Sequence, residues 1–126
     1  MPRLWPRSLL LASICLISIP TYAELRGIAS WYGWEACRSS VVSGCKTANG
    51  ERFNPEDMTA AMWDVPFNSR WRVCRADLPT RCVVVRINDR GPAKRLGRLI
   101  DLSKAAFQQL APLETGLIQV VIKPAS

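Results

Sequence analysis

Histidine is absent from the 126 residues of the chain. Its absence excludes the catalytic groups and metal sites that depend on imidazole: the Ser-His-Asp triad, the Cys-His pair and histidine-ligated zinc. Proton transfer would have to use carboxylates, tyrosine, lysine or cysteine. The sequence also contains no internal repeat and no low-complexity tract. Its 48% hydrophobic and 21% charged residues are typical of a folded globular domain and exclude a disordered chain.

No apolar run reaches the roughly 20 residues that a membrane-spanning helix needs. The longest run, residues 9–19, follows a basic start and precedes the short sequence Thr-Tyr-Ala of residues 21–23. This order is typical of an export signal. We therefore expect residues 1–23 to be a signal peptide and residues 24–126 to form one domain, exported to the periplasm or cell envelope without a transmembrane segment. A retained short anchor is the alternative.

The chain has five cysteines, four of them beyond the expected signal peptide. Cys15 lies inside the apolar run directly after a bulky isoleucine, which disfavours a lipoprotein-type modification. The other four allow three pairings. We favour the two local ones, Cys37 with Cys45 and Cys74 with Cys82, because disulfides form in the oxidising compartments that exported proteins reach. A zinc site built from the four thiolates is the alternative, although the spacing is wider than that of a CxxC knuckle.

Positive charge exceeds negative charge along the chain. The formal net charge is +7, and residues 24–126 hold 15 basic and 10 acidic residues, which leaves +5. A modestly basic exported protein suits anionic polymers such as cell-wall glycan, or an anionic membrane surface, whereas the simpler explanation is solubility alone. No segment resembles a nucleic-acid-binding module. We expect a monomer.

Short segments with β character dominate residues 24–126. Expected strands are 25–32, 71–75, 82–88 and 116–123, and the last two are rich in valine and isoleucine. Residues 77–80 are expected to turn between two of them. One helix is expected at residues 104–110, with Ser103 as its N-cap. Residues 58–62 could be a strand or a helical turn, and residues 99–101 are interpreted as a short apolar link.

Many short strands with one helix indicate a mainly β protein. A small closed barrel fits this pattern better than an open sheet, because closure removes the exposed strand edges.

Asp89 is the first candidate for catalysis. It lies where the expected strand 82–88 stops, on a turn set by Gly91 and Pro92. Its carboxylate could project over a groove, although an aspartate that opens a turn often only accepts backbone hydrogen bonds.

Glu51 is the second candidate, directly after the turn-forming pair Asn49-Gly50. Its alternative is a solvated loop glutamate. Two carboxylates on opposite sides of a glycosidic bond can supply a proton donor and a group that stabilises the positively charged transition state.

Aromatic and basic residues could bind a sugar chain around these carboxylates. The aromatic candidates for flat sugar platforms are Trp31, Tyr32, Trp34, Trp63 and Trp71, of which about half are expected in the core. A basic stretch of Arg90, Lys94, Arg95 and Arg98 could pair with the lactyl carboxylates of N-acetylmuramic acid, or could be a solvated rim.

Five ordered motifs resemble the RlpA-like family of cell-wall lytic transglycosylases. They are GIASWYG (27–33), TANGERFNPEDMTAA (47–61), VPF (65–67), VVVRINDRGP (83–92) and GRLIDLSKAAFQQL (97–110). The resemblance implies a six-stranded double-psi β-barrel, related to expansin and barwin barrels, with a groove across one face. It implies endolytic, non-hydrolytic cleavage of the N-acetylmuramic acid–N-acetylglucosamine β-1,4 bond in glycan strands, preferably without stem peptides. The substrate's own 6-hydroxyl then forms a 1,6-anhydro end, so no metal or cofactor is required.

The family's site residues map onto this chain with one departure. The resemblance assigns the catalytic acid/base to Asp89 and a catalytic role to Glu51. The family sequence TAAH here ends in Met62, which can carry no catalytic proton but could pack under a sugar ring. Asn68 stands where glycine is usual, and asparagine tolerates a left-handed turn. The substrate-binding candidates are Asn49, Trp31, Tyr32, Met62, Trp63 and Arg90.

The sequence thus supports three functions. The first is a lytic transglycosylase, a carbon–oxygen lyase acting on peptidoglycan. The second is a non-catalytic glycan-binding or wall-loosening module of the expansin type, which the replacement of the histidine by Met62 motivates. The third is a structural protein of a secretion or conjugation apparatus that uses the same barrel.

Overall fold

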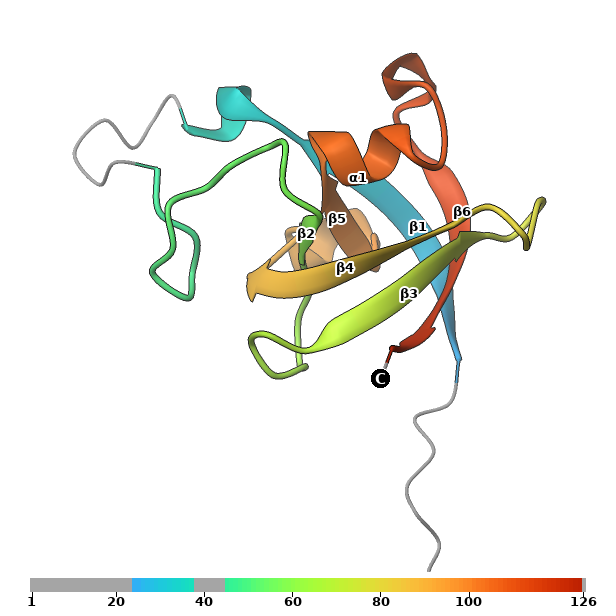
Figure 1. Ribbon diagram of the computed structural model, residues 1–126, viewed down its shortest axis with the longest axis horizontal. Helices are drawn as coiled ribbons and strands as arrows, with labels where there is room; N and C mark the ends of the chain where they lie inside the picture. Colours follow the sequence, from blue (N-terminus) through green and yellow to red (C-terminus); the bar gives the residue numbers. More distant parts are fainter. Residues whose placement is uncertain (1–23, 38–44, 126) are drawn as a thin grey trace, which may run out of the picture.

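The computed structural model describes residues 24–37 and 45–125. Six strands in these ranges close into a barrel in the order β1-β5-β2-β4-β3-β6 (Figure 1), which confirms the predicted mainly β, six-stranded closed architecture. The strands are β1 (Leu25–Tyr32), β2 (Thr59–Ala61), β3 (Arg70–Arg75), β4 (Cys82–Asp89), β5 (Ile100–Ser103) and β6 (Ile118–Pro124). The helices are α1 (Lys104–Gln108) and the single 3-10 turns η1 (Trp34–Cys37), η2 (Lys94–Leu96) and η3 (Leu113–Thr115). The predicted signal peptide, with Cys15, lies outside the described residues.

One end of the barrel gathers three strand termini. β2 runs parallel to β4 and antiparallel to β5, so β2 and β4 end where β5 begins. The connections 62–69 and 90–99 both leave this end and contact each other. Trp63 donates a hydrogen bond to the Pro92 carbonyl, and Arg90 donates one to the Met62 carbonyl. This end positions the candidate site.

Two segments differ from, or resolve, the sequence expectation. The interpretation of residues 99–101 as a link was wrong, because Ile100 begins β5 and alternates with Leu102 in the core. A strand of four residues is too short for its period to stand out from sequence. Residues 58–62, left open between strand and helical turn, contain the three-residue strand β2.

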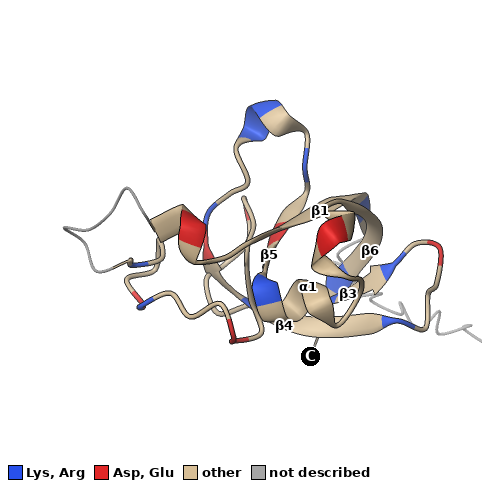
Figure 2. Cartoon of the chain, turned by 90° about the horizontal axis from the view of Figure 1, so that it is seen from above, with Lys and Arg blue, Asp and Glu red and all other residues tan. Residues whose placement is uncertain are grey.

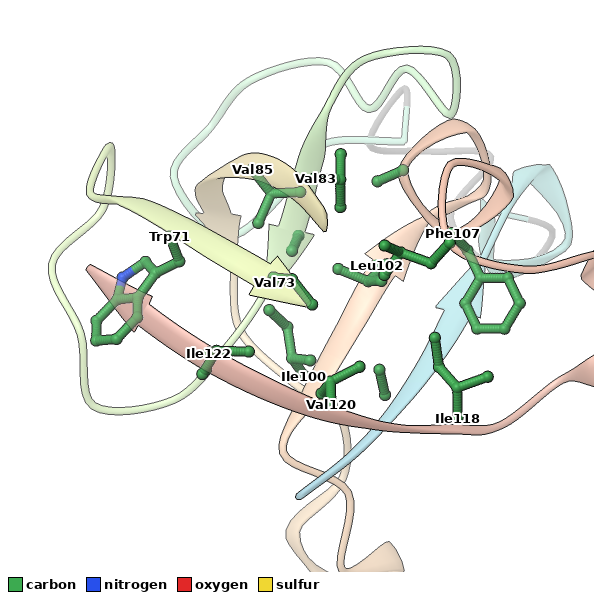
Figure 3. Close-up of a cluster of buried hydrophobic side chains, with 14 of the residues drawn as sticks. Trp71, Val73, Val83, Val85, Ile100, Leu102, Phe107, Ile118, Val120 and Ile122 are labelled. Carbon is green, nitrogen blue, oxygen red and sulfur yellow. The ribbon is translucent and has the colours of Figure 1, made fainter. Parts of the chain in front are cut away.

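The barrel interior is filled by alternate residues of the strands together with Phe107 of α1, and Figure 3 labels ten of these side chains. Val85 of β4, Ile100 of β5 and Ile122 of β6 are fully buried, and each such side chain stabilises the fold by about 1.5–3 kcal/mol. Helix α1 covers one end of the barrel and inserts Phe107 into this core. Its predicted N-cap is confirmed: the Ser103 hydroxyl accepts a hydrogen bond from the Ala106 amide.

Both local disulfides are confirmed. Cys74 and Cys82 form a registered pair across the β3–β4 hairpin, and Cys37 of η1 is bonded to Cys45. The four-thiolate zinc alternative is therefore wrong. Asn68 adopts a φ of 68°, the left-handed conformation predicted for it. Among the helices of the described ranges, none has the length and apolar character needed to cross a bilayer.

Candidate active site

A β-bulge turns Asp89 toward the outer face of the barrel. Ala60 of β2 lies opposite Ile87 of β4, but Ala61 lies opposite Asp89, so Asn88 is an extra residue in β4. Without it, alternation would place Asp89 on the same side as the core residue Ile87. Bulges are common beside active sites because they redirect a side chain in this way.

The Asp89 carboxylate is held by three donors. Its Oδ1 accepts hydrogen bonds from the amides of Ala48 and Arg90, each at 2.9 Å. Its Oδ2 accepts one from the Tyr32 hydroxyl at 3.3 Å. Asp89 is half-buried, so these contacts fix the side chain without enclosing it. The sequence reading of Asp89 as a turn-opening acceptor is therefore partly met, but the side chain also contacts two other segments.

Asp89 lies in one cross-strand row with a second carboxyl group. Ala61 is in register with Asp89 on one side and with Asp101 of β5 on the other, and Asp101 is in register with Ser30 of β1. Registered residues share a face of a sheet. Two strand spacings separate the Asp89 and Asp101 backbones by about 10 Å, with only the small Ala61 between them.

Asp101 holds a proton more readily than an ordinary aspartate. Burial raises the pKa of Asp101 to about 6, and the Asp89 charge acts in the same direction, although weakly. A hydrogen bond of 3.1 Å from the Ser30 hydroxyl and the charge of Arg98 oppose this rise. The structure thus places beside Asp89 a carboxyl group that is protonated in mildly acidic solution.

Sequence reasoning missed Asp101, which it interpreted as part of an apolar link. The available signal was an acidic residue set between the apolar Ile100 and Leu102. An acid flanked in this way on a strand points away from the core that its neighbours fill. Ser30, which donates to Asp101, was also missed, although it lies in the expected strand 25–32.

Tyr32 of β1 donates a hydrogen bond to Asp89 and lies close enough to Asp101 to be affected by its charge. Burial raises the pKa of Tyr32, and the charges of Asp89 and Asp101 raise it further. The phenol therefore remains a hydrogen-bond donor to Asp89. The ring is not a free platform on both faces, because it stacks on Phe53 with centroids 4.7 Å apart.

Glu51 occupies a different environment from Asp101. Hydrogen bonds from Arg86, at 2.5 Å and 2.9 Å, and from Asn49 lower the pKa of Glu51 to about 2, with a further contribution from Asn88. Glu51 is therefore an anion at neutral pH. Its ion pair attaches the 47–51 turn to β4, and the same turn supplies the Ala48 amide to Asp89.

Met62 and Arg90, two predicted substrate-binding residues, make internal contacts. The Met62 side chain is 2% exposed and belongs to the core. Its contact with a sugar remains a prediction. The Arg90 guanidinium donates to the carbonyls of Met62 and Val65 and lies 3.8 Å from the ring centroid of Phe67. It thereby holds the 62–69 connection against the strand end that carries Asp89.

The remaining predicted residues differ in exposure. Trp63 is 38% exposed, and its indole N–H donates to the Pro92 carbonyl at 2.6 Å. Trp31 packs partly against the core and donates to the Leu113 carbonyl. Asn49 accepts from the Thr47 hydroxyl and bonds Glu51, so it shapes the turn. Trp34 is exposed, whereas Trp71 is in the core.

Within residues 24–37 and 45–125, no group of three or more histidine, cysteine, aspartate or glutamate side chains is placed to hold a metal ion. The groups that the site presents are the carboxyl groups of Asp89 and Asp101, the phenol of Tyr32 and the ion-paired carboxylate of Glu51. The site can donate and accept protons at one position on the outer face of the barrel.

Comparison with known proteins agrees with this geometry. A family model described as lytic transglycolase matches residues 24–122. A Nostoc protein named "Probable endolytic peptidoglycan transglycosylase RlpA" is 50% identical over 100 residues, which cover 79% of this chain and 25% of that protein. A Campylobacter jejuni protein named "Endolytic peptidoglycan transglycosylase RlpA" is 42% identical over 94 residues, or 75% and 31% of the two chains. The chain thus spans about a quarter to a third of the length of these relatives.

Solved structures share the fold at low sequence identity. The Streptomyces papain inhibitor superposes with a TM-score of 0.62 at 23% identity, covering 86% of this chain and 99% of the inhibitor. An expansin from Clavibacter michiganensis superposes with a TM-score of 0.61 at 16% identity, covering 82% of this chain and 51% of the expansin. These likenesses show the double-psi barrel fold alone.

Proposed function

The chain belongs to the lytic transglycolase family, and on this basis we propose that it is an endolytic peptidoglycan lytic transglycosylase. Its substrate is the β-1,4 bond between N-acetylmuramic acid and N-acetylglucosamine in glycan strands, preferably free of stem peptides. The product is a 1,6-anhydro-N-acetylmuramic acid end. The names of the relatives at 42–50% identity support this activity. The protein works as an exported monomer in the periplasm or cell envelope, where its two disulfides are stable.

The observation that carries the proposal is the pair of carboxyl groups on either side of Ala61. Glycosidic cleavage needs a group that protonates the leaving oxygen and a group that removes a proton from the attacking hydroxyl. Asp89 and Asp101 share one face, and the raised pKa of Asp101 keeps a proton available to the pair.

We assign the acid/base role to Asp89, with Asp101 as its partner. Asp89 delivers a proton to the glycosidic oxygen, and the bond from that oxygen to the anomeric carbon breaks. The 6-hydroxyl of N-acetylmuramic acid then attacks the anomeric carbon, and its proton returns to the pair. The enzyme thus recovers its starting protonation state, and neither water nor metal takes part.

Glu51 acts in this proposal as a positioning residue. Its ion pair with Arg86 anchors the turn whose Ala48 amide holds Asp89. The negative charge of Glu51 also lies near the row, where it favours the positively charged sugar of the transition state. Asn49 keeps the turn in shape, and Trp31, Tyr32, Trp63, Met62 and Arg90 are proposed to line the path of the strand.

The test is incubation of the protein with peptide-free glycan strands, followed by mass analysis of the strand ends. We expect 1,6-anhydro ends to accumulate with the wild type and to fall about 10²–10⁴-fold with Asp89→Asn, the range that general acid–base groups contribute. Asparagine is isosteric and its oxygen can still accept from the Ala48 and Arg90 amides, so the fold should persist.

The matched control is Asp77→Asn, which removes an exposed carboxylate that pairs with Arg75 on the β3–β4 hairpin, away from the row. It should cleave at the wild-type rate. Strand binding without new ends in the wild type would contradict the proposal and favour the glycan-binding module. Ends bearing a reducing sugar would instead indicate hydrolysis.

A further inference from the structure

A cavity of about 470 Å³ lies at the barrel end where β2 and β4 stop, and its lining does not include Asp89 or Asp101 themselves. It opens between the two connections that leave the same end of the barrel. Met62 and Trp63 line it immediately after Ala61, and Arg98 lines it three residues before Asp101. A strand whose scissile bond lies over Asp89 would reach this cavity by extending across the same end of the barrel.

The cavity combines apolar walls with two cations. Its walls include Met62, Val65, Trp71 and Leu99, and its cations are Lys94 and Arg98. Figure 2 shows blue Lys and Arg segments along the connection from β4 to β5, which stands away from the barrel. The connection therefore carries positive charge over an apolar hollow.

Both cations lie at the cavity, Lys94 with an exposed side chain and Arg98 half-buried. The Lys94 ammonium lies 5.1 Å from the ring centroid of Trp63, and the Trp63 ring is itself fixed by its hydrogen bond to Pro92. Such a cation–π contact at an exposed site is weakly attractive and so favours this orientation of the lysine. Arg98 is half-buried and lies close enough to Asp101 to act on that carboxyl group electrostatically.

The lining has a single acidic residue, Asp64. In the ranges that the structure describes, no ion pair within 4.0 Å joins Asp64 to Lys94 or to Arg98. The cations thus remain available to an anion that enters the cavity. A neutral sugar would need the apolar walls and the tryptophan alone. Two convergent cations indicate a sugar that carries a carboxylate.

We propose that this cavity is the subsite for the N-acetylmuramic acid unit and that Lys94 and Arg98 bind its free lactyl carboxylate. This inference rests on the proposed function. A stem peptide converts that carboxylate into an amide, which removes the charge and adds bulk. Selection of peptide-free strands is then a property of the barrel itself, exerted through these two side chains.

The test compares two substrates: peptide-free strands with free lactyl carboxylates, and the same strands with these groups converted to methylamides. Cleavage is measured at pH 5, where Asp101 is largely protonated. We expect the KM of the wild type to be about tenfold lower for the carboxylate strands, the size of one charge-assisted hydrogen bond. Arg98→Gln should raise the KM for carboxylate strands by about the same factor and leave that for methylamide strands within about twofold.

This design separates recognition from catalysis. If Arg98 acted only through Asp101, its loss would change both substrates equally, and the proposal would be overturned. Lys94→Gln, on an exposed side chain, is the second variant and should show the same selectivity for carboxylate strands. Arg81→Gln is the matched control, because Arg81 is an exposed arginine on the β3–β4 hairpin that does not line the cavity; it should change neither KM.

A failure of the proposed function would be recognised separately. If the wild type cleaved neither strand, the equilibrium binding of both strands to the wild type would test the subsite. Binding about tenfold tighter to carboxylate strands, lost in Arg98→Gln, would support the subsite without catalysis. Equal dissociation constants for the two strands would overturn it. Equal KM values with active cleavage would overturn the subsite and leave the transglycosylase intact.

Discussion

Two acidic residues of this barrel show how the surroundings decide the role of a carboxyl group. Glu51 faces a guanidinium and two amides and has a pKa of about 2, whereas Asp101, in a half-buried row, has a pKa of about 6. The first group is a permanent anion suited to anchoring a turn. The second can exchange a proton in mildly acidic solution, as a general acid or base requires.

The pH dependence of cleavage should report Asp101. Below about pH 6 the folded protein holds a proton on Asp101; above it the proton is lost, so kcat/KM should fall by about tenfold per pH unit. The measurement is a pH–rate profile from pH 4 to 8 on peptide-free strands. Asp101→Asn should be slower by about 10²–10⁴-fold at its best pH and should lack this limb.

The same shift fixes the sign of a stability effect. A carboxyl group with a raised pKa binds its proton more tightly in the folded chain, so its contribution weakens folding as the pH rises from about 4 to 6. The free energy of unfolding of Asp101→Asn, compared with that of the wild type, should therefore be higher at pH 7 than at pH 4. A limb near pH 6 that persists in Asp101→Asn would assign that titration to another group.

At the scale of elements, the short helix α1 is held on the barrel by a few polar contacts. Ser103 is fully buried between β5 and α1, where its hydroxyl donates to the Asp57 carbonyl at 2.6 Å and accepts from the Ala106 amide. α1 has only five residues, too few to be stable by itself. The cap and the burial of Phe107 therefore hold it in place.

Ser103→Ala should lower the free energy of unfolding by about 1–3 kcal/mol. It removes a helix cap and one of the two hydrogen bonds to the Asp57 carbonyl, which keeps only the Thr59 amide as donor. Urea denaturation followed by circular dichroism measures the change. The control is Thr115→Ala, an exposed residue at the end of η3, which should shift the free energy by less than about 0.5 kcal/mol. A similar loss in both variants would show that the cap is not the cause.

At the scale of the molecule, basic residues lie on both the strands and the connections, as the blue segments in Figure 2 show. Residues 24–126 carry a formal net charge of +5. Peptide-free glycan strands carry one carboxylate for each N-acetylmuramic acid unit. Long-range attraction between the two should speed encounter and depend on ionic strength.

The KM for carboxylate strands should therefore rise several-fold between about 0.05 M and 0.5 M salt, because the Debye length shrinks to a few ångströms. The kcat should change little, because Asp89 and Asp101 are half-buried and act on the bound sugar at short distances that salt screens weakly. Steady-state kinetics at fixed pH measures both. Methylamide strands serve as the control and should show a much weaker dependence; an equal rise for both strands would contradict an electrostatic origin.

The sequence by itself determined the barrel class, the long strands, the capped helix and the family, and it favoured the two local disulfides. Each of these depends on local patterns: β-branched runs, an N-cap serine, cysteines at close spacing and ordered motifs. Asp89 was predicted because it follows a recognisable strand, and Glu51 because it follows an Asn-Gly turn.

Only the tertiary structure decided how the site is assembled. The row of Ser30, Asp101, Ala61 and Asp89 joins four strands that are distant in sequence, and the bulge at Asn88 brings the last of them to the outer face. The pKa of Asp101 depends on burial, which no local pattern encodes. Contacts and desolvation across strands arise only when the barrel closes, so they could not be predicted from neighbouring residues.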